Sequence, residues 1–282
     1  MKPFFSGTRP GKSMTLGGEK FELPILYFRD DAFALFYTAD PAKVKALLPS
    51  ERLHPVTLSK KKALLGVACF NYIDTTIGPY GEVGIVVPAI FADKKPLHAI
   101  PAIRESYDPR FGSVVLHLPV TNTIARDGGR GLWGYTKFVA DMRFVITPEY
   151  LQCELGEDGR HILTARVARR GLIKKDYRPL SSFSVKDKKL IQTTIPQVGT
   201  ARNSLFPEGS FLELGDHEII GPIRELGLSK KPVMSRYYLE RSAILPEGKV
   251  IEEKVRDLEG YRGTDRHGEH TVVYLDEKDK KK

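Results

Sequence analysis

The chain has 282 residues, of which 41% are hydrophobic and 28% charged, a composition typical of a globular protein with a buried core. Its formal net charge of +9 raises the question of nucleic-acid binding, but the basic runs are scattered at turn-like places and do not gather with aromatic residues on one element. We therefore expect no nucleic-acid partner.

The N-terminal sequence, the apolar stretches and the number of cysteines indicate where the protein is located in the cell. The first eighteen residues, MKPFFSGTRPGKSMTLGG, contain no continuous apolar region, so no signal peptide is expected. The most apolar stretch, Gly84 to Ala92, is too short to span a bilayer. With two cysteines in the whole chain a disulfide framework is excluded. These features predict a cytoplasmic protein without a membrane partner.

Taken in chain order, the sequence predicts many strands and few helices. Residues 1–20 are polar and Gly-rich, and we expect them to be loosely ordered. Asp40-Pro41 predicts a helix start, and Pro49 its end. Strands are expected at residues 62–72, 83–91, 113–120, 138–147, 162–168 and 237–245.

Two further helices are predicted between these strands. One is expected at about residues 121–130, and the other begins near Asp216 or Pro222 and ends at Gly227. Residues 276–282 form a polar tail. The sequence thus predicts one α+β, mostly β domain at residues 21–275, with a closed or strongly curved sheet.

The stretch Gly129-Arg-Gly-Leu-Trp-Gly134 matches the dinucleotide-binding pattern G-x-G-x-x-G. That pattern needs a strand before the first glycine and a helix after the last. Here the expected helix precedes the glycines, and an alternating strand follows them. We therefore expect no nucleotide and no other cofactor at this motif.

Lys137, three residues after Gly134, has two interpretations. It is either a solvated lysine at a helix-to-strand corner, as most lysines are, or an inward-facing amine among Leu132, Trp133, Tyr135 and Phe138. Burial away from water favours the neutral amine, which is the nucleophile that forms a Schiff base with a ketone. The residues alone leave both interpretations open.

The segment GRGLWGYTKF (residues 129–138) resembles the G-R-E-L-x-x-Y-P-K segment of the acetoacetate decarboxylase-like superfamily, which carries its Schiff-base lysine. Residues 63–89 are similar to that family's strand, long loop and Y-x-E-x-G element. Residues 29–49 are similar to its N-terminal strand and D-P-x-x-V-x-x-L-L-P helix, and residues 212–233 to a further segment.

The resemblance implies a cone-shaped antiparallel β-barrel with flanking helices, an interior pocket and a homo-oligomer. It implies that Lys137 is the Schiff-base lysine and that Glu82 orients substrate or assists proton transfer. Arg29 would meet a substrate carboxylate, after a one-residue gap in the match. Trp133, Tyr135 and Phe138 would complete the substrate-binding residues. No metal is implied.

Four positions depart from the family pattern. Phe138 replaces a second lysine, Gly131 replaces the glutamate of G-R-E-L, and Thr136 replaces the proline. The family's other acidic pocket residue should fall near Gly66 or Val67, where this sequence has no acid. These changes suggest a larger or less polar keto substrate than acetoacetate. We therefore expect a lyase that acts on a keto acid through Lys137, by decarboxylation or by related aldol or dehydration chemistry. The alternative is a barrel that binds a small molecule without turning it over.

Overall fold

The structure is a computed structural model that describes residues 3–9, 11–99, 108–258, 260–264 and 266–275. The predicted polar tail at 276–282 lies outside these residues. The helical segments are the 3-10 helix η1 (Pro3–Phe5), α1 (Pro41–Ala46), α3 (Thr123–Gly128), the π-helix η2 (Gly129–Trp133) and α4 (Ile220–Glu225). None of the described helices is long and apolar enough to cross a membrane.

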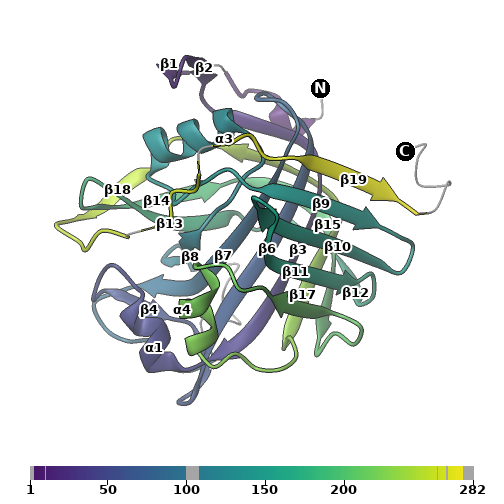
Figure 1. Ribbon diagram of the computed structural model, residues 1–282. Helices are drawn as coiled ribbons and strands as arrows, with labels where there is room; N and C mark the ends of the chain where they lie inside the picture. The colour runs from purple at the N-terminus through teal and green to yellow at the C-terminus, as the bar shows by residue number, and fades with distance from the viewer. Residues whose placement is uncertain (1–2, 10, 100–107, 259, 265, 276–282) are drawn as a thin grey trace.

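A twelve-stranded sheet forms the largest part of the molecule. Its order runs β12 (Leu172–Asp176), β15 (Gln197–Leu205), β17 (Met234–Leu245), β3 (Ile25–Ala39), β6 (Lys62–Thr75), β7 (Tyr80–Phe91), β8 (Phe111–His117), β13 (Leu180–Lys186), β14 (Lys189–Ile195) and β18 (Lys249–Glu253). Two short strands, β4 (Leu53–Pro55) and β5 (Thr57–Ser59), pair with β7 and β6. The long strands β3 and β6 lie side by side across the middle of the molecule (Figure 1).

A five-stranded sheet lies over one face of the large sheet (Figure 1). Its order is β16 (Phe211–Leu214), β11 (Arg160–Ala168), β10 (Tyr150–Glu157), β9 (Asp141–Ile146) and β19 (His270–Tyr274). A separate hairpin is formed by β1 (Ser13–Leu16) and β2 (Glu19–Glu22), mostly within the segment expected to be loosely ordered.

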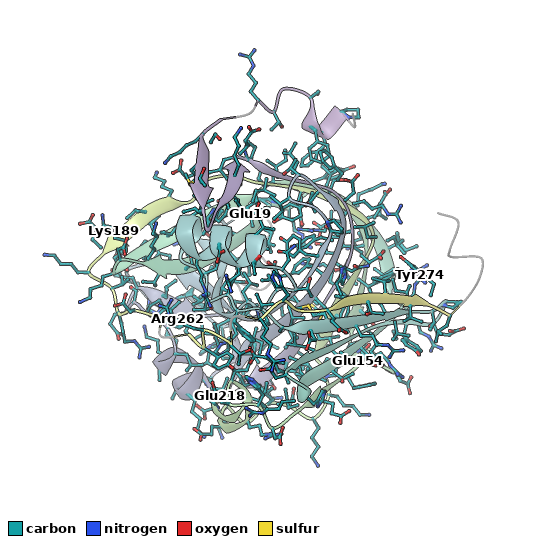
Figure 2. All side chains as sticks on the ribbon, turned by 45° about the horizontal axis from the view of Figure 1, so that its top comes forward. Glu19, Glu154, Lys189, Glu218, Arg262 and Tyr274 are labelled. Atoms are coloured by element: carbon teal, nitrogen blue, oxygen red, sulfur yellow. The ribbon has the colours of Figure 1, made fainter. Side chains whose placement is uncertain are left out.

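The main hydrophobic core fills the space between the two sheets. Strand side chains alternate between faces, so odd-numbered residues of β7 and even-numbered residues of β9 enter this core. The alternating residues of the strand expected at 138–147 all lie in it, namely Phe138, Ala140, Met142, Phe144 and Ile146. Charged side chains such as Lys189 and Glu218 lie on the outside (Figure 2).

The closed barrel implied by the family resemblance is not what the structure shows. The mostly β character and the small number of helices are confirmed, and most strand pairs are antiparallel. Within the described residues, however, the large sheet is open: its order ends at β12 on one side and at β18 on the other. Both end strands have five residues, which limits the hydrogen bonds that either could offer to the other.

The predicted helices are confirmed, and local chemistry explains their ends. The carboxylate of Asp40 accepts hydrogen bonds from the amides of Ala42 (2.9 Å) and Lys43 (3.0 Å) and so caps α1. In α4 the side chains of Ile220 and Ile223 are buried, which holds the helix against the core. Lys43 reaches across to donate to the carbonyl of Glu225 at 2.7 Å, which ties α1 to the end of α4.

Helix α3 continues into the π-helix η2, which ends at Gly134 with a left-handed φ of 69°. A side chain is strained at that φ, and a Cβ at Gly134 would collide with the carbonyl oxygen of Val185 in β13. The glycine therefore permits a sharp exit from the helix against a neighbouring strand. The chain then runs extended beside the residues that follow β8, through the bonds Leu118 N to Thr136 O (3.1 Å) and Val120 N to Phe138 O (2.9 Å).

His117, the last residue of β8, makes the stability of the fold depend on pH. Burial, with a smaller contribution from His217, lowers the pKa of His117 from 6.5 to about 4. Between these two pKa values the unfolded chain binds a proton at His117 that the folded chain does not bind. The free energy of unfolding is therefore highest above pH 6.5 and decreases as the pH falls toward 4. We expect His117→Gln to reduce the loss of unfolding free energy across this window by up to about 3 kcal/mol.

The measurement is urea denaturation of the wild type and the variant at several pH values. His161→Gln, at an exposed position of β11, is the matched control and should follow the wild type. If the free energy of unfolding changed with pH equally in the wild type and in His117→Gln, His117 would not be the source of the pH dependence.

Candidate active site

A cavity of about 110 Å³ lies on the face of the large sheet that turns away from the five-stranded sheet. Side chains alternate along a strand, so each strand of the large sheet directs one set of residues into the core and the other set toward this cavity. The contributions are Ala68, Phe70 and Tyr72 from β6, Glu82, Gly84 and Val86 from β7, Ser113 and Val115 from β8, Leu180, Ser181 and Ser182 from β13, and Arg241, Ala243 and Leu245 from β17.

Lys137 enters this cavity from the extended segment after η2. Only 5% of the residue is exposed, and its Nζ lies 2.5 Å from Oε2 of Glu82. The rings of Tyr80 and Tyr135 flank the amine, with centroids 5.8 and 6.0 Å from Nζ. Of the two interpretations of the sequence, the inward-facing lysine is therefore the one that the structure bears out.

Gly129 makes room for the stem of Lys137. A Cβ built on Gly129 would lie 2.5 Å from Cε of Lys137 and closer still to Cδ. Real carbon atoms do not approach one another so closely, and the lysine is held at its far end by Glu82. The first glycine of the G-x-G-x-x-G pattern thus serves close packing against the lysine, and π-helical turns such as η2 are frequent at functional sites.

Glu82 is positioned by the pairing of β6 with β7. It lies directly opposite Phe70 in the register, so its side chain points to the cavity face. One carboxylate oxygen pairs with Lys137, and the other, Oε1, accepts a hydrogen bond from the hydroxyl of Tyr72 at 3.1 Å. Both oxygens of this buried carboxylate therefore have partners, as a charge removed from water requires.

Four tyrosines surround the pair. The hydroxyls of Tyr27 and Tyr80 are 2.9 Å apart, and the hydroxyls of Tyr135 and Ser182 are at 2.7 Å. Burial raises the pKa of Tyr135 to about 12 and raises the pKa of Tyr27, Tyr72 and Tyr80 well above 10. The phenols therefore stay neutral at physiological pH and offer O–H donors to a reacting oxygen.

Arg241 is a site residue that the sequence did not reveal. It is 4% exposed and lines the cavity, and it donates through Nη1 to Asp30 at 2.5 Å and through Nε to Gln197 at 2.8 Å. Burial alone would lower the pKa of Arg241, but the nearby Asp30 outweighs it and the pKa is raised, so the guanidinium remains charged. The same strand also carries Arg236 and Glu240, so the sequence contained no signal that singled out Arg241.

The other residues predicted to bind substrate are placed as follows. Tyr135 lines the cavity together with Lys137 and Glu82. Trp133 is buried one layer behind, where its indole N–H donates to the carbonyl of Pro246 at 2.9 Å. Phe138 is fully buried in the core between the sheets, stacked on the ring of His217. The structure does not bring Phe138 to the cavity because neighbouring residues of an extended chain face opposite sides.

Arg29 is also not brought to the cavity. The pairing of β3 with β6 is irregular on both sides of Arg29, between Tyr27 and Arg29 and again between Arg29 and Asp30. This bulge turns the side chain of Arg29 to the exposed side, while Tyr27 stays on the cavity face. The carboxylate-binding position that was expected at Arg29 is therefore not on the cavity wall.

The size of the cavity bears on the expected substrate. Phe138 adds no side chain to the cavity, so the substitution of the second lysine does not shape it directly. At about 110 Å³ the space is smaller than a cavity of about 150 Å³ that accommodates benzene. This volume favours a small substrate, contrary to the larger one that the sequence suggested. Within the described residues no three His, Cys, Asp or Glu side chains form a metal-binding group.

Comparisons with known proteins agree with this fold. The chain resembles the acetoacetate decarboxylase of Legionella pneumophila subsp. pneumophila str. Philadelphia 1, with a TM-score of 0.63 and 20% identity over 88% of this chain and 94% of the other. It also resembles the enduracididine biosynthesis enzyme MppR complexed with pyruvate, with a TM-score of 0.58 and 13% identity over 82% of this chain and 91% of the other. No match is found among curated proteins.

A third similar structure is an acetoacetate decarboxylase-like enzyme from Sphingomonas wittichii RW1, with a TM-score of 0.57 and 13% identity over 81% of this chain and 93% of the other. At these identities the likeness of structure establishes the fold alone. The family model for acetoacetate decarboxylase (ADC) matches residues 13–255, which is most of the chain. The protein therefore belongs to the acetoacetate decarboxylase family.

Proposed function

We propose that the protein is a Schiff-base enzyme in which Lys137 condenses with the ketone of a small keto acid. The observation that carries this proposal is the amine of Lys137, buried in a tyrosine-lined cavity with a carboxylate oxygen 2.5 Å away. A nucleophile and a base within hydrogen-bond reach, in a site that excludes water, are the parts that imine formation needs.

The first steps follow from the contacts of Lys137. Glu82 accepts a proton from the ammonium, and the free amine adds to the substrate carbonyl carbon to give a carbinolamine. The carbonyl oxygen takes up a proton and leaves as water, and the protonated imine remains. Glu82, which took the proton from the ammonium, is the acid that returns it, and the hydroxyl of Tyr72 donates to its other carboxylate oxygen.

The protonated imine can accept an electron pair from a neighbouring bond, and two reactions can supply that pair. Loss of CO₂ from the β-carbon of a β-keto acid, or loss of a proton from the carbon next to the imine, gives the same kind of neutral enamine. Structures similar to this chain support both chemistries: one is an acetoacetate decarboxylase, and MppR is known complexed with pyruvate and complexed with the condensation product of pyruvate and imidazole 4-carboxaldehyde. Decarboxylation and aldol or dehydration chemistry are therefore both within the proposal, and either would make the protein a lyase.

The ion pair itself favours a second candidate function. A lysine that remains protonated beside Glu82 cannot attack a carbonyl, and the same cavity would then bind a small molecule without turnover. The two functions differ in whether Lys137 forms a covalent bond with a ketone.

Borohydride trapping distinguishes them. After incubation with a panel of β-keto and α-keto acids and reduction, we expect a substrate-dependent mass increase on the peptide that contains Lys137, read by mass spectrometry. The adduct should be absent in Lys137→Gln, whose amide keeps a hydrogen-bond donor for Glu82, and unchanged in Lys189→Gln, at an exposed position. A folded wild-type protein that gives no adduct with any of these acids would support ligand binding without turnover.

Glu82→Gln removes the base and keeps its shape. We expect the rate of adduct formation to fall on the order of 10²- to 10⁴-fold, the usual contribution of general acid–base catalysis, measured by single-turnover trapping at pH 7. Glu154→Gln, on the other sheet, is the control. An adduct rate within about twofold of the wild type would exclude Glu82 from proton transfer.

Gly129→Ala tests the packing of the lysine stem. The helical φ of −62° accepts alanine, but the new methyl group would displace the side chain of Lys137 from Glu82. We expect trapping to be lost or slowed on the order of 100-fold while the protein remains folded, as a displacement of about 1 Å often produces. Gly131→Ala, in the same π-helix but facing Leu16 of β1, should keep most of the activity. Equal losses in both variants would mean that only the helix had been disturbed.

A further inference from the structure

Arg241 shares the cavity with Lys137, and nothing in the proposed imine chemistry uses it so far. Its guanidinium carbon lies 5.2 Å from the ring centroid of Phe70. Phe70 stacks on Tyr72, with ring centroids 5.4 Å apart, and Tyr72 donates to Glu82. The buried arginine and the lysine–glutamate pair are therefore connected along one wall of a small cavity.

The guanidinium has hydrogen-bonding capacity left over. An arginine has five N–H donors, and here Nε donates to Gln197 and Nη1 donates to Asp30. Within the described residues Nη2 has no acceptor. Guanidinium N–H groups form charge-assisted hydrogen bonds with carboxylates, for which their planar geometry is suited. The edge of Arg241 that carries Nη2 is thus available for an anionic oxygen.

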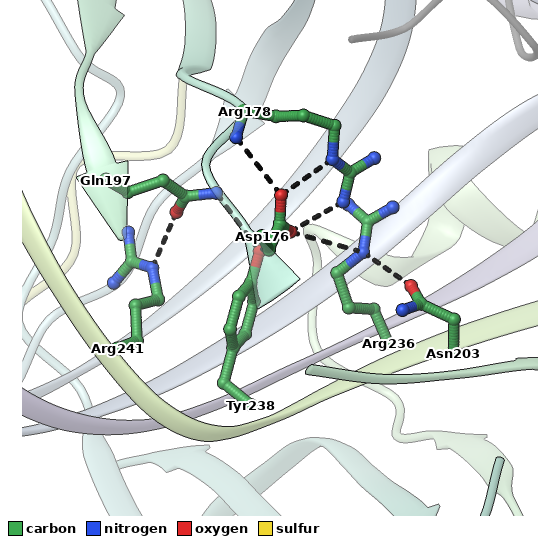
Figure 3. A network of polar contacts seen from close by, with 7 residues as sticks. All are labelled: Asp176, Arg178, Gln197, Asn203, Arg236, Tyr238 and Arg241. Carbon is green, nitrogen blue, oxygen red and sulfur yellow. Dashed lines mark hydrogen bonds and ion pairs between the residues drawn. The ribbon is translucent and has the colours of Figure 1, made fainter. Parts of the chain in front are cut away.

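A chain of hydrogen bonds fixes the orientation of Arg241 (Figure 3). Gln197 accepts from Arg241 through Oε1 and donates through Nε2 to the hydroxyl oxygen of Tyr238 at 3.1 Å. Tyr238 donates in turn to Asp176 at 2.9 Å, and Asp176 is held by Arg178 with contacts of 2.7 and 2.6 Å. In this chain each group donates to the next, from Arg241 through Gln197 and Tyr238 to Asp176. The guanidinium is therefore held in one orientation before any ligand binds.

A carboxylate that enters this cavity needs a polar partner, because the charges already present there are balanced. Lys137 with Glu82 and Arg241 with Asp30 form two pairs of opposite charge, so neither pair leaves a surplus. A carboxylate that enters this apolar space needs charged or polar partners, because an unpaired buried charge is costly. Arg241 supplies a fixed cation with a free donor, while the nitrogen of Lys137 is bonded to the substrate carbon in the imine.

We propose that Arg241 binds the carboxylate of the keto acid and thereby favours reactions that keep that carboxylate over reactions that release it as CO₂. This inference rests on the proposed imine at Lys137. Loss of CO₂ converts the anion that Arg241 holds into a neutral molecule, so the arginine stabilises the ground state more than the transition state and raises that barrier.

Removal of a proton keeps the charged contact intact. In the protonated imine of an α-keto acid, Glu82 accepts the proton from the adjacent carbon. The C–H electron pair becomes the C=C bond of the enamine, and the C=N electron pair moves to the nitrogen of Lys137. The carboxylate stays on Arg241 throughout, so its binding energy is unchanged along this step. The enamine carbon is then the nucleophile for a second carbonyl compound.

The test compares the wild type with Arg241→Gln on three probes. The probes are pyruvate, an α-keto acid; acetoacetate, a β-keto acid; and butanone, a neutral ketone. The readouts are borohydride trapping at Lys137, exchange of the methyl protons of pyruvate for deuterium by NMR, and CO₂ release from acetoacetate. We expect the half-saturating pyruvate concentration to rise on the order of 10- to 100-fold in Arg241→Gln, as for a lost hydrogen bond to a charged group. Trapping of butanone should change less than about twofold, and CO₂ release from acetoacetate should rise relative to exchange of pyruvate.

Arg166→Gln is the matched control, because Arg166 donates through Nε to Gln152 at 2.7 Å in the same way but on the other sheet. Since Arg241→Gln leaves Asp30 buried without its cation, the double variant Asp30→Asn/Arg241→Gln provides a folded form if the single variant does not fold. An unchanged half-saturation for pyruvate, or an equal loss with butanone, would overturn the role of Arg241 and leave the imine standing. No adduct with any probe in the wild type would remove the imine itself, and the inference with it.

Discussion

The ion pair between Lys137 and Glu82 is the contact on which the rest of the site depends. Both charges are removed from water, at a cost of several kcal/mol for each ion, and such a pair persists only where further hydrogen bonds and tight packing hold it. Tyr72 satisfies the second oxygen of Glu82, and the absence of a side chain at Gly129 admits the lysine stem. The surrounding phenols contribute donors without adding charge. The cavity is thus organised around the contact between one buried amine and one buried carboxylate.

The period of two along a strand lets one sheet serve two purposes. Successive residues of β7 alternate between the core under the five-stranded sheet and the cavity, so Val83 and Ile85 stabilise the fold while Glu82 and Gly84 shape the site. A shift of one residue in register would exchange these faces and place a carboxylate in the hydrocarbon core. Correct strand register and a correct site are therefore the same structural requirement, which ties the function to the stability of the whole sheet.

Local patterns in the sequence predicted the helices and several of the strands, and the family resemblance pointed to Lys137 and Glu82, which the structure brings together. They were insufficient where the position of a side chain depends on pairing between strands that are distant in the sequence. Alternation alone would place Arg29 on the same face as Tyr27, but a bulge that depends on the pairing with β6 turns it outward. Arg241 lies more than 200 residues from Asp30 in the chain, and only the pairing of β17 beside β3 brings the two together. The open order of the large sheet likewise follows from which strands become neighbours, which no single segment encodes.

The place of β3 in the large sheet has a consequence for biosynthesis. It pairs with β6 on one side, but its partner on the other side is β17, at Met234–Leu245. A chain emerging from the ribosome therefore carries β3 with one edge unpaired until Met234–Leu245 has been made. Exposed edges of this kind recruit other strands, and pairings between distant segments form slowly. The nascent chain is therefore open to incorrect pairing at β3 until β17 has been made, and this is the interval in which a chaperone would protect it.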